Sequence, residues 1–128
     1  MATSTPRSVP VFSELFYNDS DLPEETLAAV EGKKNNVPIK VKMMMSGENM
    51  IAIKAIRPKG HIDASHQHDD HESIATLVKG RMRVWIEDKE FIAEPGAIWR
   101  HPAGVPHQSE CLEDCIQFEI KSPGRKTW

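Results

Sequence analysis

Beyond residue 36, apolar and polar side chains alternate along the chain. Apolar side chains occupy every second position over residues 39–45, and Lys40 and Lys42 lie between them. A period of two residues is typical of a β-strand that buries one face. Turn residues at 46–49 and a β-rich run at 50–56 predict a second strand that returns along the first.

Shorter runs of the same kind follow, and turn signals such as Lys79-Gly80 and Pro95-Gly96 separate them. These runs cover residues 74–78, 81–87, 91–93, 97–100 and 115–121. Strands that recur about every 8–12 residues, with turns between them, indicate an antiparallel sandwich or barrel. We therefore predict an all-β fold in one domain over residues 1–128, because a chain of this length fits a single core.

One segment near the N-terminus has the signals of a helix instead. Asp21 is suited to cap a helix, and Glu24 lies three residues on as its partner in a capping box. Pro23 is tolerated in a first helical turn, and Gly32 is a typical stop signal. We expect one short N-terminal helix over residues 23–31, packed outside the sheets.

Composition and charge exclude several classes of function. The 16 Lys and Arg residues against 19 Asp and Glu residues give a net charge of −3, so the chain lacks the basic excess that nucleic acid or anionic lipid attracts. No apolar run approaches the roughly 18 residues of a membrane helix, and the first residues do not resemble a signal peptide. Two cysteines cannot build a disulfide framework. We expect a cytoplasmic protein that binds a small molecule and contacts neither nucleic acid nor membrane.

The six histidines carry the candidate chemistry, because all of them lie between His61 and His107. His66 and His68 are two residues apart, so an extended chain points both imidazoles to the same side. This is how one strand presents two ligands to one metal ion. A single pair of this kind is weak evidence, and the surrounding residues strengthen it.

Two glycine-containing segments frame these histidines: Gly60-x5-His66-x-His68 with Gly80 after it, and Gly96-x5-Pro102-x-Gly104-x2-His107. Their spacing resembles the two motifs of the cupin family, Gly-x5-His-x-His-x3–4-Glu-x6-Gly and Gly-x5-Pro-x-Gly-x2-His-x3-Asn. Cys111 stands where the second motif has Asn. The resemblance covers about residues 60–80 and 96–111. It implies a small antiparallel β-barrel of the double-stranded β-helix, or jelly-roll, type, and it suggests a homodimer.

The resemblance also implies one divalent metal ion per chain, held by His66, His68 and His107. The family's acidic ligand falls on Ser73 when counted back from Gly80, and on Glu72 when counted forward from His68. These two residues must face opposite sides of a strand. We favour Ser73 inward and Glu72 outward, which leaves three neutral imidazoles as ligands.

Two alternatives for a fourth ligand stay open: His71, which shares the parity of Ser73, and Glu72 itself. We expect His61 and His101 to lie at the surface or at the rim of the pocket. A site without a carboxylate ligand is a stronger Lewis acid and leaves more positions for substrate. Iron is the favoured ion, and zinc, manganese and nickel are alternatives.

Residues beside the ion must move protons or orient the substrate. Glu119 and Gln117 share one face of the last predicted strand, and Lys54 lies on the strand before the first motif. Glu119 is the candidate catalytic residue if this face lines the barrel. We favour the other interpretation, in which the three side chains form a solvated face.

Further side chains have both an ordinary and a functional interpretation. We expect the aromatic side chains Trp85, Trp99 and Phe118 to belong to the core rather than to a pocket wall. Cys111 and Cys115 flank a predicted hairpin turn, and we expect neither a disulfide nor a nucleophile there.

The function that the resemblance favours is metal-dependent, O2-dependent oxidation of a small, chelating, anionic or enolisable substrate by a dioxygenase-like enzyme. One alternative is a non-redox, metal-dependent lyase, isomerase or polyketide-type cyclase, in which Glu119 or a histidine moves the proton. A second alternative is a cupin that binds or senses a small molecule without catalysis, because one fold hosts many functions.

Overall fold

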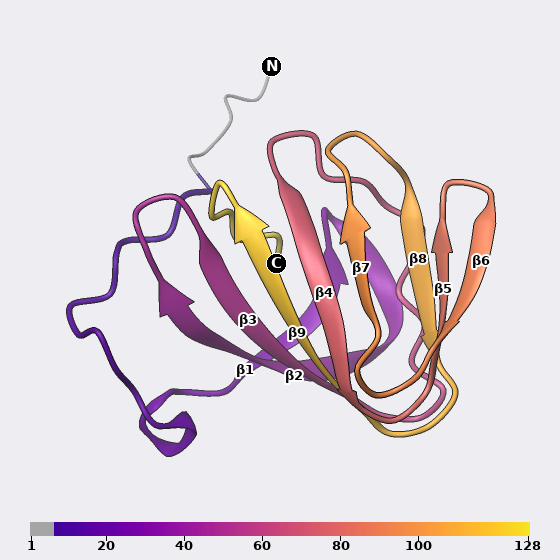
Figure 1. Cartoon of the computed structure of the whole chain (residues 1–128), viewed down its shortest axis with the longest axis horizontal. Coiled ribbons are helices and arrows are strands. Elements are labelled where there is room, and N and C mark those ends of the chain that lie inside the picture. The colour runs from indigo at the N-terminus through magenta and orange to yellow at the C-terminus, as the bar shows by residue number, and fades with distance from the viewer. Residues whose placement is uncertain (1–6) are drawn as a thin grey trace.

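The computed structural model describes residues 7–128, which form two antiparallel sheets (Figure 1). The larger sheet has the strand order β1-β2-β3-β9-β4-β7, and the smaller has the order β6-β5-β8. The strands are β1 (Glu25–Val30), β2 (Lys33–Ser46), β3 (Ile51–Arg57), β4 (Glu72–Lys79), β5 (Met82–Ile86), β6 (Lys89–Ala93), β7 (Ile98–His101), β8 (His107–Cys111) and β9 (Cys115–Ser122). The prediction of an antiparallel all-β fold is confirmed, although the strands form two sheets rather than one closed ring.

The helix predicted over residues 23–31 is wrong. Residues Glu25–Val30 are strand β1, which pairs with β2 so that Leu27 lies opposite Ile39. Leu27 is buried with the apolar side chains of β2 and β3, and this packing outweighs the local helix signals. The capping signal belongs instead to a single 3-10 turn at Asp19–Asp21, where the Asn18 backbone N–H donates to Asp21 Oδ2 at 2.8 Å.

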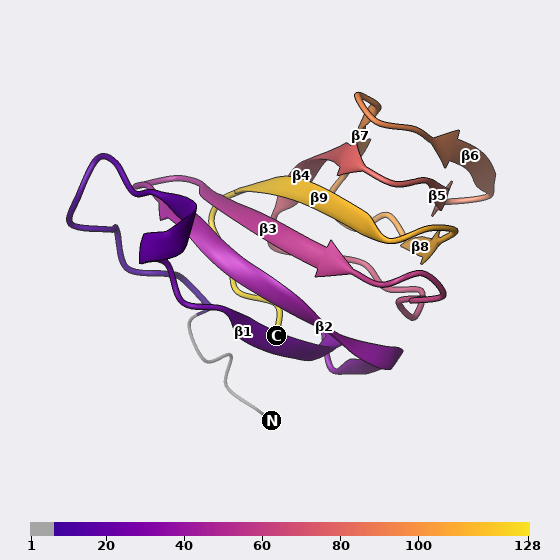
Figure 2. The same ribbon diagram turned by 90° about the horizontal axis from the view of Figure 1, so that it is seen from below.

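Two apolar clusters hold the sheets. One joins Val41 of β2 to Ile51 and Ile53 of β3, and the side chain of Trp128 packs against it. The other lies between the two sheets and contains Leu77, Met82, Val84, Ala93, Cys111 and Cys115. Figure 2 shows the C-terminal segment running back from the end of β9 toward β1 and β2. The backbone N–H of Glu31 donates to the Thr127 carbonyl there, at 2.9 Å.

The outward face of β4, β7 and β9 is unusually apolar. Ile98 is 69% exposed, and Ile74 and Ile120 are also exposed on this face. On the opposite face of these strands, Ser73 and Lys121 are buried, which matters for the site described below. The expected homodimer stays a prediction. Among residues 7–128, no helix is long and apolar enough to cross a membrane.

The turn between β4 and β5 is a position where only glycine fits. Gly80 has φ +95°, and a Cβ there would lie 2.4 Å from the Asp114 carbonyl oxygen and 2.7 Å from Cys115 Sγ. Gly96 has nearly the same φ, +96°, but no atom lies within 4 Å of its ideal Cβ. Substituting the two glycines therefore distinguishes the cost of backbone strain from the cost of steric overlap.

We expect Gly96→Ala to lower the free energy of unfolding by about 1–3 kcal/mol through strain alone. Gly80→Ala should cost clearly more, because backbone atoms of the β8–β9 turn must also move. Urea unfolding of the two variants and the parent chain measures both losses. Equal losses would contradict the close contact at Gly80.

Candidate metal centre

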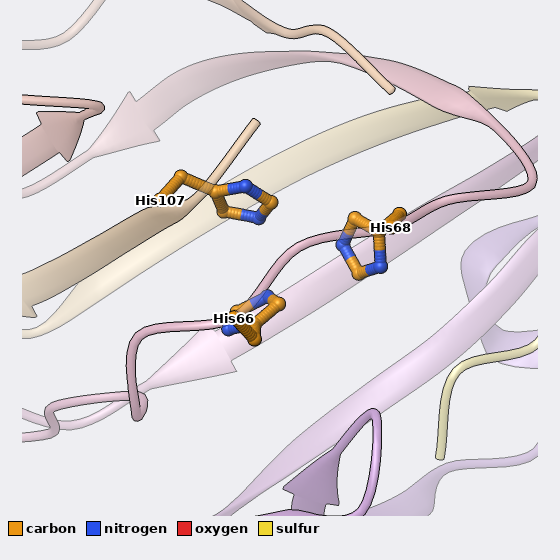
Figure 3. A group of neighbouring side chains, drawn as sticks. All are labelled: His66, His68 and His107. Carbon is orange, nitrogen blue, oxygen red and sulfur yellow. The ribbon is translucent and has the colours of Figure 1, made fainter. Parts of the chain in front are cut away.

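The two histidine motifs meet through the backbone. The N–H of His66 donates to the His107 carbonyl at 3.0 Å, and the N–H of His107 donates back to the His66 carbonyl at 2.8 Å. The Gly104 N–H donates to the His68 carbonyl at 2.8 Å. Residues 60–68 thus run along the edge of β8 that β5 leaves free. The pairing brings three imidazoles together from positions some 40 residues apart in the chain (Figure 3).

His66, His68 and His107 form one compact group of buried nitrogen donors. One ring nitrogen from each lies within 4.8 Å of the others. The ring centroids of His66 and His107 are 4.3 Å apart, and those of His66 and His68 are 5.0 Å apart. Among residues 7–128 this is the one cluster of histidine, cysteine and carboxylate side chains with spacing suited to a metal ion.

Hydrogen bonds at Nδ1 fix which nitrogen of each ring is free. His66 Nδ1 lies 2.6 Å from the Ala64 carbonyl, and His68 Nδ1 lies 2.6 Å from Glu31 Oε2. His107 Nδ1 lies 3.3 Å from the Val105 carbonyl. These partners are acceptors, so the proton of each neutral ring is on Nδ1 and the Nε2 lone pair is left for a metal. The donor set therefore fits a divalent ion.

The surroundings also keep two of these rings, His68 and His107, neutral. Burial, together with the Lys121 ammonium group, lowers the pKa of His68 to about 4. Burial and the neighbouring imidazole of His101 lower the pKa of His107 to about 2. Both imidazoles are therefore unprotonated near pH 7, which is the form that binds metal.

A chain of charged groups supports His68 from outside the cavity. Arg7 pairs with Glu31, the residue that binds His68, and donates from Nη2 to Asp70 Oδ1 at 2.7 Å. Asp70 in turn accepts from His71 Nδ1 at 2.7 Å. Burial raises the pKa of Asp70, but Arg7 and His71 outweigh it and hold the pKa at about 2. No sequence pattern indicated this network, because it joins segments that are distant along the chain.

The residues near the family's acidic position divide as strand parity predicts. Glu72 is exposed and accepts from Arg100 Nη1 at 3.2 Å, whereas Ser73 is buried. His71 is also buried, but its ring stacks on that of His68 at 4.4 Å and its Nε2 has no partner. Neither His71 nor Glu72 belongs to the compact group of three.

The expectation that His101 and His61 lie at the surface or rim is wrong. His101 is 6% exposed, and its ring stacks on His107 at 3.8 Å with an interplanar angle of 8°. Trp99 Nε1 donates to His101 Nε2 at 3.0 Å, so the ring proton is on Nδ1 and is donated to Ser73 Oγ at 2.9 Å. Ser73 thus orients a histidine where the family's motif has a ligand. His61 is 1% exposed.

The preference for a solvated face at Gln117 and Glu119 is also wrong. Both line an interior cavity of about 80 Å³ together with the three imidazoles and with Lys121, the next residue of the same parity. Glu119 lies opposite Ala75, whose small side chain leaves room beside it. Lys54 behaves as expected: it faces outward and donates to Asp19 Oδ2 at 2.5 Å.

Glu119 is ionised inside this cavity. Burial raises the pKa of Glu119, but the Lys121 ammonium group and the nearby imidazoles outweigh it and lower the pKa to about 2. Glu119 Oε2 is 3.8 Å from Lys121 Nζ, and Gln117 Nε2 donates to Glu119 Oε1 at 3.3 Å. Lys121 is a functional candidate that the sequence analysis missed, although its parity with Glu119 was a signal for it.

The remaining candidate side chains, two tryptophans and two cysteines, lie in different environments. Trp99 lines the cavity, whereas Trp85 lies on the outside and donates to Glu90 Oε1. Cys111 and Cys115 are free thiols in the core, and burial raises the pKa of Cys111 to about 12. A thiol with so high a pKa is a poor nucleophile, as expected.

We expect His107→Ala to lose the metal that the parent chain retains, because it removes one of three donors. Elemental analysis of protein purified without added metal measures the content. His71→Asn is the matched control and should keep its metal; equal loss in both variants would make His71 a fourth ligand.

Glu31→Gln should weaken metal affinity about 10–100-fold, because it removes the charge that orients His68 and raises its basicity. Competition with a chromophoric chelator gives the affinity. Glu72→Gln should leave it unchanged, since Glu72 faces solvent. A loss of affinity confined to Glu72→Gln would place the acidic ligand there after all.

Comparison with known proteins supports the fold and the motifs together. The cupin domain family model matches residues 53–117. KdgF from Halomonas sp. is 23% identical with a TM-score of 0.73, over 86% of this chain and 95% of that protein. An RmlC-like cupin from Shewanella frigidimarina is 22% identical with a TM-score of 0.77, over 89% and 95% of the two chains.

A predicted oxalate decarboxylase from Thermotoga maritima is 14% identical with a TM-score of 0.73, over 85% of this chain and 98% of that one. No curated protein matches the sequence. At these identities the solved structures establish the fold and leave the reaction open. The family model spans half of the chain and includes all three clustered histidines. This protein therefore belongs to the cupin family.

Proposed function

We propose that this cupin is a metal-dependent enzyme that transfers a proton on a small, chelating, anionic substrate, as a lyase, isomerase or cyclase does. The observation that carries the proposal is the ionised carboxylate of Glu119, which lines the same small cavity as the three clustered imidazoles. A half-buried carboxylate in the same cavity as a metal site suits enolisation, because a base and an electrophile must act on one substrate.

His66, His68 and His107 would hold the ion through Nε2. A bound divalent ion supplies Lewis acidity, which polarises a substrate carbonyl and stabilises the enolate formed from it. The donor set consists of imidazole nitrogen atoms, which suit iron, zinc and nickel, and iron remains the favoured ion.

Glu119 would take the proton from the carbon next to that carbonyl. The C–H bond breaks, its electron pair enters the enolate, and an O–H bond forms on Glu119. Glu119 then returns the proton to a different atom of the enolate, so that the step consumes no co-reactant. Lys121 holds the carboxylate in its ionised form before substrate arrives. A bound anion that draws Lys121 away would raise the pKa of Glu119 and so its ability to accept the proton.

Oxidation by O2 is the second candidate, and the composition of the donor set favours it. The three clustered ligands are neutral, and no carboxylate of residues 7–128 belongs to the cluster. Three ligands leave positions for a chelating substrate and for O2. Binding without catalysis is the third candidate, and the charged pair of Glu119 and Lys121 in the cavity argues against it.

We expect Glu119→Gln to lower the rate of proton transfer about 10²–10⁴-fold with metal content unchanged. The measurement is deuterium uptake from D2O into small 2-oxo acids, followed by proton NMR with metal-loaded protein. Glu72→Gln, an outward-facing carboxylate, is the matched control and should exchange at the parent rate.

The same assay under nitrogen and under air separates the candidates. Equal exchange in both atmospheres supports proton transfer, and O2 uptake without exchange supports oxidation. Metal-loaded protein that does neither across the panel would overturn the proposal of an enzyme for this substrate class.

A further inference from the structure

Arg57 is a buried cation whose side-chain hydrogen bonds go to neutral groups. It ends β3 and is 5% exposed. Its Nε donates to His61 Nδ1 and its Nη1 to Gln117 Oε1, each at 2.9 Å. Both partners are neutral groups. Among residues 7–128, no Asp or Glu oxygen lies within 4.0 Å of its guanidinium nitrogens.

Two hydrogen-bond donors at this position have no acceptor. Arg57 Nη2 is buried without a partner. His61 accepts from Arg57 at Nδ1, so the proton of its neutral ring is on Nε2, and that atom is also buried without a partner. Burial and the adjacent Arg57 charge lower the pKa of His61 to about 3, which keeps the ring neutral. Buried donors without acceptors are rare in folded proteins and often mark a functional site.

The carboxylates of the cavity are already engaged elsewhere. Glu119 is paired with Lys121. Asp63 Oδ1 accepts from the Ser109 backbone N–H at 2.6 Å and from Ser109 Oγ at 3.3 Å. Within residues 7–128 the charge on Arg57 therefore has no carboxylate in ion-pair contact, and burying an unpaired charge is costly. A protein keeps such a group where a ligand supplies the opposite charge.

We propose that Arg57 and His61 bind a carboxylate group of the substrate. Both side chains line the cavity that also contains the three clustered imidazoles. The substrate class is then a small organic acid with a carboxylate at one end and a carbonyl or enol oxygen for the metal at the other. The role of that second end rests on the proposed function; carboxylate binding at Arg57 does not.

Charge and size favour a carboxylate over a phosphate. One guanidinium and one neutral imidazole offer a single positive charge, which matches a carboxylate and leaves half of a phosphate dianion uncompensated. The cavity of about 80 Å³ also favours a compact ligand. Phosphate serves as a competing probe in the test.

The test measures binding of malonate and of its neutral analogue malonamide by calorimetry. Protein is used as purified and again after dialysis against EDTA, so that a carboxylate on the metal is distinguished from one on Arg57. We expect malonate to bind in both preparations and malonamide and phosphate to bind at least tenfold more weakly. Arg57→Met should weaken malonate binding at least tenfold. Arg57→Lys should weaken malonate binding less, since lysine keeps the positive charge and loses only the planar, two-donor geometry of the guanidinium group.

Arg81→Gln, an exposed arginine, is the matched control and should bind like the parent. Malonate bound only before EDTA treatment, or bound equally well by Arg57→Met, overturns the proposal. If Arg57→Met does not fold, the parent protein decides alone: equal binding of malonate and malonamide after EDTA treatment overturns it. Loss of metal binding with malonate binding intact would overturn the proposed function and leave this subsite standing.

Discussion

The reciprocal backbone pair between His66 and His107 is the interaction on which the rest of the site depends. Opposed residues of a hydrogen-bonded antiparallel pair have Cα atoms about 5.5 Å apart and side chains on the same face. The two bonds therefore place two imidazoles side by side without any help from the side chains. His68 follows two residues later, where the Gly104 N–H holds its carbonyl. A slip of one residue would turn His66 away and dismantle the donor set.

The interior around this pair is polar, and hydrogen bonds make that arrangement stable. The row Lys121, Ser73 and His101 crosses β9, β4 and β7 at one level of the sheet. Each of these side chains has a defined partner: Thr127 for Lys121, and Ser73 and Trp99 for His101. Fully satisfied networks of this kind fix one geometry, whereas unsatisfied ones cost stability. Arg57 Nη2 and His61 Nε2 depart from this rule as two donors on residues that line the cavity, which is why that departure points to a ligand.

Sequence patterns predicted the strands and the pairing of His66 with His68, because both depend on local spacing, whereas His107 entered only through the resemblance to the cupin motifs. Parity separated Glu72 from Ser73, but it could not say which face of β9 is inside. The apolar residues of β9 suggested the buried face, yet Ile120 is exposed and Lys121 is buried at 3% exposure. The helix prediction failed for a related reason: local sequence signals do not report that Leu27 lies opposite Ile39 on a neighbouring strand. The roles of Arg7 and Glu31 could not be predicted from sequence spacing, because their partners lie far along the chain.

The serine at the family's acidic position connects these features. A carboxylate at residue 73 would neutralise part of the metal charge, whereas Ser73 only orients His101. Two cationic side chains, Arg57 and Lys121, and two acidic ones, Asp63 and Glu119, line the cavity, but among these four only Lys121 and Glu119 form an ion pair. The charge of a bound divalent ion then has no counterpart among the ligands. A substrate with one carboxylate at Arg57 and a second negative charge that develops at the metal would balance the charge of the ion. Lys121 would then pair with the substrate instead of Glu119. The loss of an acidic ligand and the buried arginine therefore favour the same substrate class, a carboxylic acid that can enolise.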